Sequence, residues 1–112
     1  MSYPTIYIRD KAFINLLRRN KKYELRLYRG IIKKFKPGDI VYLMNGSRNT
    51  FCMMVIKTMH LYENFTELMS ELGSINCLPN HTFKDGLKHM NNIYSPELQN
   101  KHSVVAIEFK FE

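Results

Sequence analysis

The sequence predicts an α+β domain, a small mixed β-barrel with about three helices, formed by residues 1–112 as a single unit. Apolar residues mostly alternate with polar ones, which indicates strands, and helical spacing of apolar residues occurs in only three segments. Strands and helices do not follow each other in a regular alternation, which argues against a Rossmann-like sheet. A chain of 112 residues has the usual length of one domain and can bury a core without disulfides.

The first third of the chain is predicted to form a strand, a helix and a second strand. Residues 5–9 alternate as a short strand, and Asp10 is a good N-cap for a helix that runs to about Arg19. The apolar stripe of this helix has a spacing that favours burial of Ala12, Phe13, Leu16 and Leu17. Residues 22–28 follow as the second strand.

The middle of the chain reads as a hairpin, with strands over residues 40–44 and 50–59 around the turn at 45–47. A helix over residues 64–72 is predicted to stop at Gly73. Thr82 is expected to cap the third helix, with the inward residues Phe83, Leu87 and Met90.

The pair Ser95-Pro96 is expected to end the helical region. Residues 103–111 alternate as a last strand, with Val105, Ile107, Phe109 and Phe111 on one face.

Positive charge is concentrated near the start of the chain. Residues 1–36 hold 11 lysines and arginines against two acidic residues, a net charge of +9, whereas residues 37–112 carry −2. A local positive field attracts polyanions, and interleaved tyrosines make nucleic acid the first partner to consider. A solvated helix face with a lysine-rich turn is the other interpretation of the same residues.

The strand at residues 22–28 contains the candidate site. Side chains alternate on a strand, so Glu24 and Arg26 share a face with Lys22 and Tyr28. Lys21 joins them only if it precedes the regular strand. A lysine beside a carboxylate and an arginine can bind phosphate or a base, or can act as base or nucleophile if burial lowers its pKa. An ordinary half-exposed strand has the same alternation.

Other kinds of site have little support in the sequence. The four histidines include no metal-ligand spacing beyond Cys77-x-x-x-His81, and there is no glycine-rich phosphate loop, so neither a metal nor a cofactor is expected. Cys52 lies in an apolar run and is expected in the core, while Cys77 falls in a loop-like stretch. With no signal-peptide pattern and no apolar span, we expect a cytoplasmic or nuclear protein that is not secreted and has no membrane partner.

Three motifs together resemble the ASCH domain, a small member of the PUA-like superfamily. They are Lys21-Lys22-Tyr23-Glu24-Leu25-Arg26, Lys36-Pro37-Gly38-Asp39 and Val105-Ala106-Ile107-Glu108-Phe109. The resemblance spans nearly the whole chain and implies a PUA-like barrel with a cleft beside the Lys-x-x-Glu-x-Arg strand. ASCH proteins are thought to bind RNA, and some are similar to ribonucleases or to amidohydrolases that deacetylate N4-acetylcytidine.

The amidohydrolase pattern is matched only in part. Its lysine corresponds to Lys21, whereas Glu24 stands where that family has a threonine, and residues 79–81 offer no acid where a late glutamate is expected. An aromatic cage for a base would have to use tyrosines such as Tyr23, Tyr28 or Tyr94, since the chain has no tryptophan.

Three functions remain open at this point. The first is a module that binds RNA or a nucleoside or nucleotide in a basic cleft. In it Lys21 and Lys22 contact phosphate, Arg26 contacts a base or phosphate, and Glu24 orients Arg26. The residues expected to extend this surface are Arg9, Arg18, Arg19 and Tyr28. The second is a small hydrolase in which Lys21 and Glu24 are catalytic. The third is a protein-interaction domain with a flat surface around Glu24.

Overall fold

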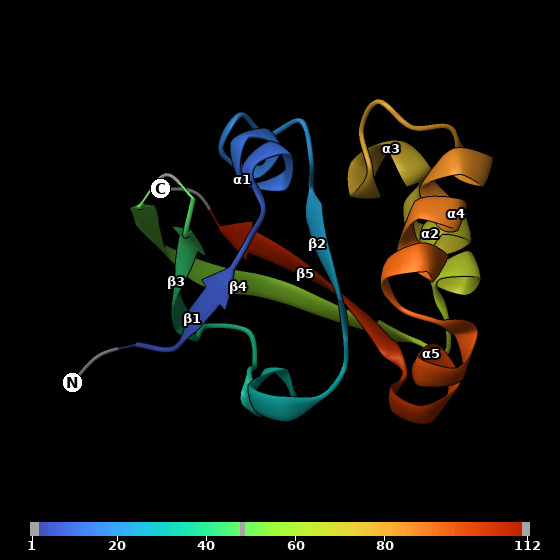
Figure 1. Ribbon diagram of the computed structural model, residues 1–112. Helices are drawn as coiled ribbons and strands as arrows, with labels where there is room; N and C mark the ends of the chain where they lie inside the picture. Colours follow the sequence, from blue (N-terminus) through green and yellow to red (C-terminus); the bar gives the residue numbers. More distant parts are fainter. Residues whose placement is uncertain (1–2, 48, 111–112) are drawn as a thin grey trace.

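The structure is a computed structural model that describes residues 3–47 and 49–110. Within this part the chain forms five strands, which are β1 (Thr5–Tyr7), β2 (Tyr23–Leu27), β3 (Ile40–Asn45), β4 (Thr50–Tyr62) and β5 (Val104–Lys110). It also forms five α-helices, which are α1 (Asp10–Leu17), α2 (Phe65–Leu72), α3 (Ser74–Cys77), α4 (Phe83–Ile93) and α5 (Pro96–His102), and a 3-10 helix η1 (Gly30–Lys34). Figure 1 shows their arrangement. The predicted α+β class is confirmed, with five helices rather than about three.

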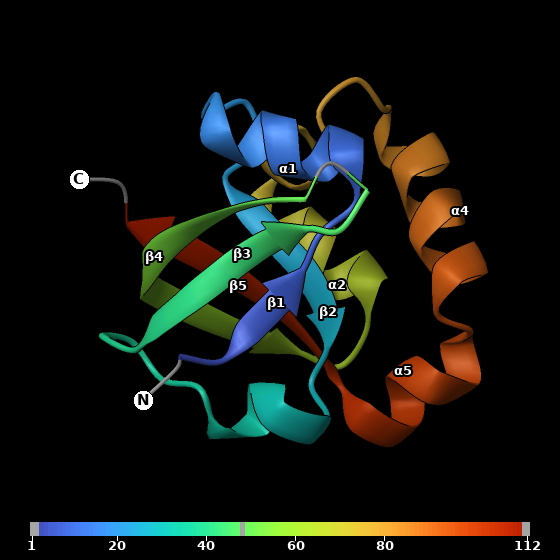
Figure 2. The ribbon, with the colours of Figure 1, turned by 60° about the vertical axis from the view of Figure 1, so that its left-hand side comes forward.

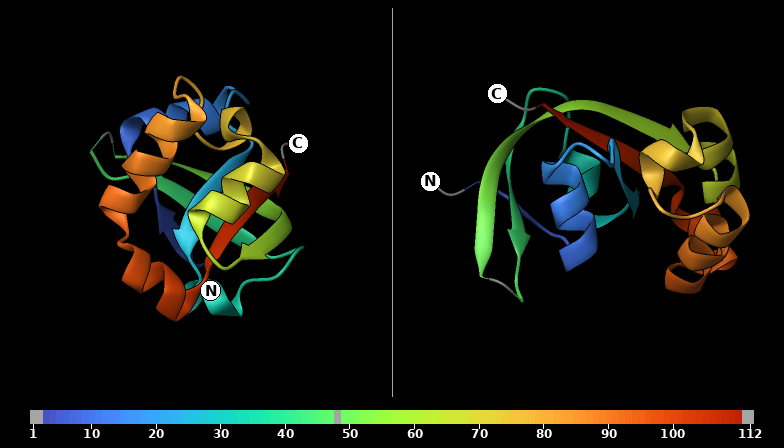
Figure 3. Two further views of the ribbon diagram at one scale, coloured as in Figure 1. Left: turned by 90° about the vertical axis from the view of Figure 1, so that its right-hand side faces the viewer. Right: turned by 90° about the horizontal axis from the view of Figure 1, so that it is seen from above.

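The strands form one sheet in the order β1-β3-β4-β5-β2. β1 pairs with β3 in parallel, and every other pair in this sheet is antiparallel. The sheet curls into a half-barrel, with β1 and β2 as its two edges and α1 inside the curl (Figure 3). The small mixed barrel expected from the sequence therefore takes the form of an open, curled sheet.

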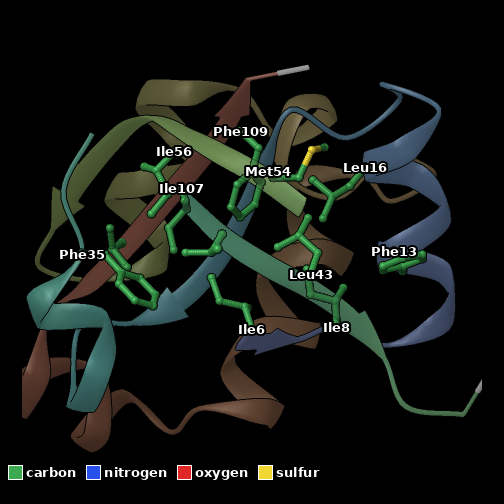
Figure 4. Close-up of a cluster of buried hydrophobic side chains, with 12 residues drawn as sticks. Ile6, Ile8, Phe13, Leu16, Phe35, Leu43, Met54, Ile56, Ile107 and Phe109 are labelled. Carbon is green, nitrogen blue, oxygen red and sulfur yellow. The ribbon is translucent and has the colours of Figure 1, made fainter. Parts of the chain in front are cut away.

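A first hydrophobic cluster fills the concave side of the sheet, between the strands, α1 and η1. The side chains in Figure 4 come from β1, α1, β3, β4 and β5 and from the residues that directly follow β1 and η1, and they point toward this common interior. Phe13 and Leu16 are the buried residues of α1, and they lie on the stripe that the sequence predicts. Leu17, expected on the same stripe, is exposed because its position turns away from the sheet.

A second cluster lies on the other face of β2 and β5, under α2, α3 and α4. Tyr23, Leu25 and Leu27 pack there against Phe65, Leu68, Met69 and Met90 from the helices. β5 contributes to both clusters, with Val105, Ile107 and Phe109 in the first and Val104 and Ala106 in the second. Burial on both faces explains why the sequence of this strand is apolar at nearly every position.

Several local expectations differ from the structure. Asp10 is the first residue of α1 rather than its cap, and its carboxylate accepts hydrogen bonds from Asn45 and Ser47. Phe83 is exposed, because α4 turns Met90 and Gly86 toward the core instead. Cys77 lies in α3 and is fully buried, whereas Cys52 is only half-buried against the first cluster.

The pair Ser95-Pro96 begins a helix, whereas the sequence predicts that the helical region ends there. Proline suits the first turn of a helix because its missing N–H would have no partner there. The Ser95 hydroxyl accepts a hydrogen bond from the N–H of Leu98, and α5 follows. The last strand is observed to Lys110, so the predicted inward position of Phe111 lies outside the described residues.

Candidate functional site

Lys21 lies before the regular part of β2, so the alternation of side chains along the strand does not set the direction of its side chain. After α1 the chain turns through Arg19, which has a positive φ of 63°. The N–H groups of Asn20 and Lys21 both donate to the Asn15 carbonyl, at 2.9 and 3.1 Å. β2 then begins at Tyr23, so Lys21 precedes the regular strand. The side chain of Lys21 can therefore reach Glu24, which strict alternation would have prevented.

Lys21, Glu24 and Arg26 form a connected ionic network. Lys21 Nζ lies 3.9 Å from Glu24 Oε1 and donates a hydrogen bond to the Cys77 carbonyl. Arg26 Nε donates to Glu24 Oε2 at 2.8 Å. Lys21 is 4% exposed and Glu24 is 6% exposed, so the charges are screened little by water. A single carboxylate thus holds two cations.

Arg26 also links the two edges of the half-barrel. Its Nη2 donates to the backbone carbonyl of Tyr7, so the guanidinium of edge strand β2 contacts edge strand β1. Glu24 holds the same guanidinium through Nε. The network therefore lies at the seam where a closed barrel would have joined its first and last strands.

Burial shapes the acid–base properties of this network. Removal from water lowers the pKa of Lys21 below its ordinary value, because the charged ammonium loses hydration; Glu24 opposes the shift and Arg26 adds to it. Burial also raises the pKa of the Cys77 thiol to about 11, partly offset by the nearby Lys21. Cys77 is accordingly a protonated, packed side chain at neutral pH.

A cleft of about 640 Å³ lies beside the start of β2, and we call it the basic cleft. Its lining residues are Arg19, Asn20, Lys21, Lys22, Lys57, Asn76, Glu108, Phe109 and Lys110. Glu108 is the one acidic residue among them, and it lies 3.7 Å from Lys57 Nζ and 4.0 Å from Lys22 Nζ. Because Lys21 is already paired with Glu24, the other four cations against Glu108 give this cleft a net positive charge.

A second cavity of about 340 Å³ lies beside the end of β2. Its lining residues are Arg26, Leu27, Arg29, Gly30, Ile31, Ile32 and Tyr94. Tyr94 stacks on Phe65, with ring centroids 5.9 Å apart. The network thus has one member, Lys21, in the basic cleft and another, Arg26, in this second cavity.

The structure brings together some of the predicted site residues and separates others. Lys21, Glu24 and Arg26 form the network, and Lys22 and Arg19 line the basic cleft. Arg9 and Arg18 are exposed and line neither cavity. Tyr28 also lines neither, because it packs half-buried against the first cluster, where Lys33 Nζ lies 5.9 Å from its ring centre.

Sequence reasoning missed the part of the basic cleft that comes from distant strands. Lys57 and Lys110 reach it through the pairing of β4 with β5, which places Val55 opposite Lys110. A register shift between Ile56 and Thr58 leaves Lys57 as an extra residue in β4. Lys57 lies within β4 and Lys110 ends β5, and only the pairing of these two strands brings the lysines to one cleft, which the sequence alone does not reveal.

Among the described residues, the histidines and helices show no metal site and no membrane span. Within residues 3–47 and 49–110 no group of three or more His, Cys, Asp or Glu side chains is placed to hold a metal ion. His81 and His89 lie with ring centres 5.5 Å apart, and Tyr23 packs edge-on against His60. No helix in the described part of the chain is both long and apolar enough to cross a membrane.

Comparison with known proteins establishes the fold. No protein-family model matches the chain, and no curated protein matches it. The crystal structure of hypothetical protein PH0355 is similar, with 27% identity and a TM-score of 0.85 over 97% of this chain and 98% of that one. The solution NMR structure of protein PF0455 from Pyrococcus furiosus is also similar, with 26% identity and a TM-score of 0.78 over 97% of this chain and 96% of that one. The same architecture thus spans whole chains of comparable length.

Proposed function

We propose that this chain is an RNA- or nucleotide-binding domain of the ASCH type, with its ligand in the basic cleft beside the Lys21-x-x-Glu24-x-Arg26 strand. The observation that carries the proposal is the lining of that cleft by five cations and one carboxylate. Phosphate groups are the anions that such a cluster binds best, through charge-assisted hydrogen bonds. Lys22 and Lys57 supply most of the contact, because their side chains are 50% and 58% exposed and share a single carboxylate, that of Glu108.

Arg26 has a second role in this proposal. Glu24 and the Tyr7 carbonyl each accept one of its hydrogen bonds, which fixes the plane of the guanidinium. The remaining N–H donors are available to a base edge or a phosphate in the second cavity, since an arginine has five. Tyr94 offers an aromatic ring in the same cavity, which suits a nucleobase.

Salt dependence of RNA binding tests the proposal. Each phosphate contact with a single strand contributes a slope of about −0.7 in log affinity against log salt. We expect Lys57→Ala to make the slope shallower by about that amount. Lys101→Ala is the matched control, because it removes the same charge from α5, away from the basic cleft. Binding that is absent, or equally strong at all salt concentrations, would refute the proposal.

A small hydrolase is the second candidate, favoured by the lowered pKa of Lys21 and by its place in the basic cleft. A larger neutral fraction of the amine is what a base or nucleophile needs. Turnover of N4-acetylcytidine by wild type and by Lys21→Met, which keeps the buried aliphatic volume, separates the two functions. Turnover that disappears in the variant would identify an enzyme, whereas RNA binding without turnover would identify a binding domain.

A flat surface around Glu24 would favour a protein-interaction domain instead. The structure instead has a cavity at each end of β2, one lined by Lys21 and the other by Arg26. Cavities of this size favour a nucleotide or a single strand over the surface of another protein. If the wild type neither binds nucleic acid nor turns over N4-acetylcytidine, the protein-interaction domain becomes the favoured interpretation.

A further inference from the structure

The outward face of β1, β3 and the first half of β4 carries a group of aromatic and methionine side chains, four of them exposed and two half-buried. We call it the aromatic face, and its residues are Tyr3, Tyr7, Tyr42, Met44, Phe51 and Met53. The register places Tyr7 beside Met44 and Met44 beside Phe51, while Tyr42 pairs with Met53. Side chains of directly paired residues lie on the same face, so these residues form one continuous surface.

Large apolar side chains are usually buried, but several on this surface are exposed to solvent. Tyr7 is 65% exposed, Phe51 is 62% exposed and Met53 is 57% exposed. The rings are nevertheless ordered against one another, with Tyr42 edge-on to Tyr3 at 5.8 Å and edge-on to Phe51 at 5.5 Å. Figure 2 looks onto β1 and β3, and no helix lies in front of them. Contiguous exposed apolar surface of this kind marks a binding site more often than chance.

The aromatic face adjoins the basic cleft. Alternation along β4 puts Val55 on the same face as Phe51 and Met53, and Val55 pairs with Lys110. Lys110 therefore lies at the edge of the aromatic face, and Lys57 lines the basic cleft together with it. Phe51 and Val55 are separated by about 13 Å along the strand, given a rise of about 3.3 Å per residue. A short stretch of nucleotides spans that distance.

The charge of the chain decides which occupant fits this surface. A second copy of the chain would bring another +7 molecule against a face bordered by lysines. A single strand of RNA instead offers phosphates to the cations and bases to the rings. Every base has a face that stacks on an aromatic side chain, so this mode of binding does not depend strongly on the RNA sequence.

We propose that the aromatic face stacks the bases of single-stranded RNA whose phosphate backbone continues into the basic cleft. This inference rests on the proposed function and narrows its ligand to unpaired strands. Bases of a duplex are stacked inside the helix and cannot reach Tyr7 or Phe51. The face then supplies contact energy that salt does not screen, beside a cleft whose contacts are salt-dependent.

Fluorescence anisotropy with a labelled RNA of about ten nucleotides, single-stranded and as a duplex of the same sequence, tests the inference. We expect the single strand to bind more tightly than the duplex. Tyr7→Ala and Phe51→Ala should each weaken single-strand binding about tenfold while leaving the salt slope unchanged. Phe83→Ala is the matched control, because it removes an exposed aromatic ring from α4, and it should bind as the wild type does. Circular dichroism confirms that each variant is folded.

The outcomes separate this inference from the proposed function. Salt-dependent binding that Tyr7→Ala and Phe51→Ala leave intact would overturn the stacking surface and leave the basic cleft standing. A duplex bound as tightly as the single strand would do the same. A wild type that binds neither RNA would overturn both. A dimer in sedimentation that Phe51→Ala dissociates would assign the aromatic face to a second copy of the chain.

Discussion

Replacement of Glu24 by glutamine should destabilise the protein strongly, although glutamine has almost the same shape. Glu24 is the only carboxylate in the network among the described residues, and it holds Arg26 at 2.8 Å and Lys21 at 3.9 Å. Glu24→Gln keeps an oxygen that accepts a hydrogen bond but removes the negative charge. Two cations, one of them buried, then face each other without a counter-charge.

The size of the effect follows from these distances. With an effective dielectric constant of about 20, the two attractions amount to about 6 and about 4 kcal/mol before desolvation is counted. Removal of one partner from a buried pair typically costs about 3–5 kcal/mol. The side chain of Arg26 is 24% exposed and regains some hydration, so we expect about 3 kcal/mol. For 112 residues this lowers the melting temperature by about 13 °C.

Urea unfolding followed by circular dichroism measures this loss, and Glu108→Gln provides the control. Glu108 also lies near two cations, at 3.7 and 4.0 Å, but the side chains of these lysines are 58% and 50% exposed. Exposed ion pairs contribute about 1 kcal/mol or less. A Glu24→Gln variant that unfolds within about 1 kcal/mol of the Glu108→Gln variant would refute the argument that burial makes the network strong.

Three further predictions concern single groups. Lys21→Met leaves the Glu24–Arg26 pair intact and should lower the free energy of unfolding by less than Glu24→Gln does, as the same urea experiment would measure. Burial holds the pKa of Lys21 in the folded protein below its ordinary value of 10.5, so at pH values between the folded and the unfolded pKa the unfolded chain binds more protons than the folded one. The stability of the wild type relative to Lys21→Met should therefore rise as the pH rises through this window. Urea titrations at a series of pH values measure this difference, and a flat or falling difference would contradict the prediction. Cys77, fully buried and with a pKa of about 11, should resist alkylation in the native protein at neutral pH while the half-buried Cys52 reacts faster, and mass spectrometry after brief iodoacetamide treatment would identify the modified residue. Equal modification of the two cysteines would contradict the last prediction.

The sequence was a good guide wherever neighbouring residues determine the structure. Alternation placed Glu24 and Arg26 on one face, and the condition that Lys21 must precede the strand is met because the turn after α1 delays β2 until Tyr23. The helix cap predicted at Thr82 is also confirmed, since its hydroxyl accepts a hydrogen bond from the N–H of Asp85. Local chemistry of this kind depends on spacing along the chain.

Contacts between residues far apart in the sequence could not be predicted, because spacing along the chain does not determine them. Lys57 and Lys110 meet only because β4 pairs with β5 in one particular register. The link from Arg26 to the Tyr7 carbonyl depends on how far the sheet curls, which no segment of sequence specifies alone. Phe83 was placed inward by helical periodicity, yet the rotation of α4 is set by Gly86, where a β-carbon would lie 3.1 Å from both Leu78 and Met69. The use of the site by RNA stays a prediction.

The double burial of β5 has a consequence for how the protein is made. Val105 and Ile107 complete one hydrophobic cluster and Val104 and Ala106 complete the other, so neither cluster can close before this strand is present. Until residues 104–110 are available, the apolar residues that precede them therefore have no complete cluster to join. A nascent or truncated chain that lacks β5 is expected to expose apolar surface of the kind that chaperones bind.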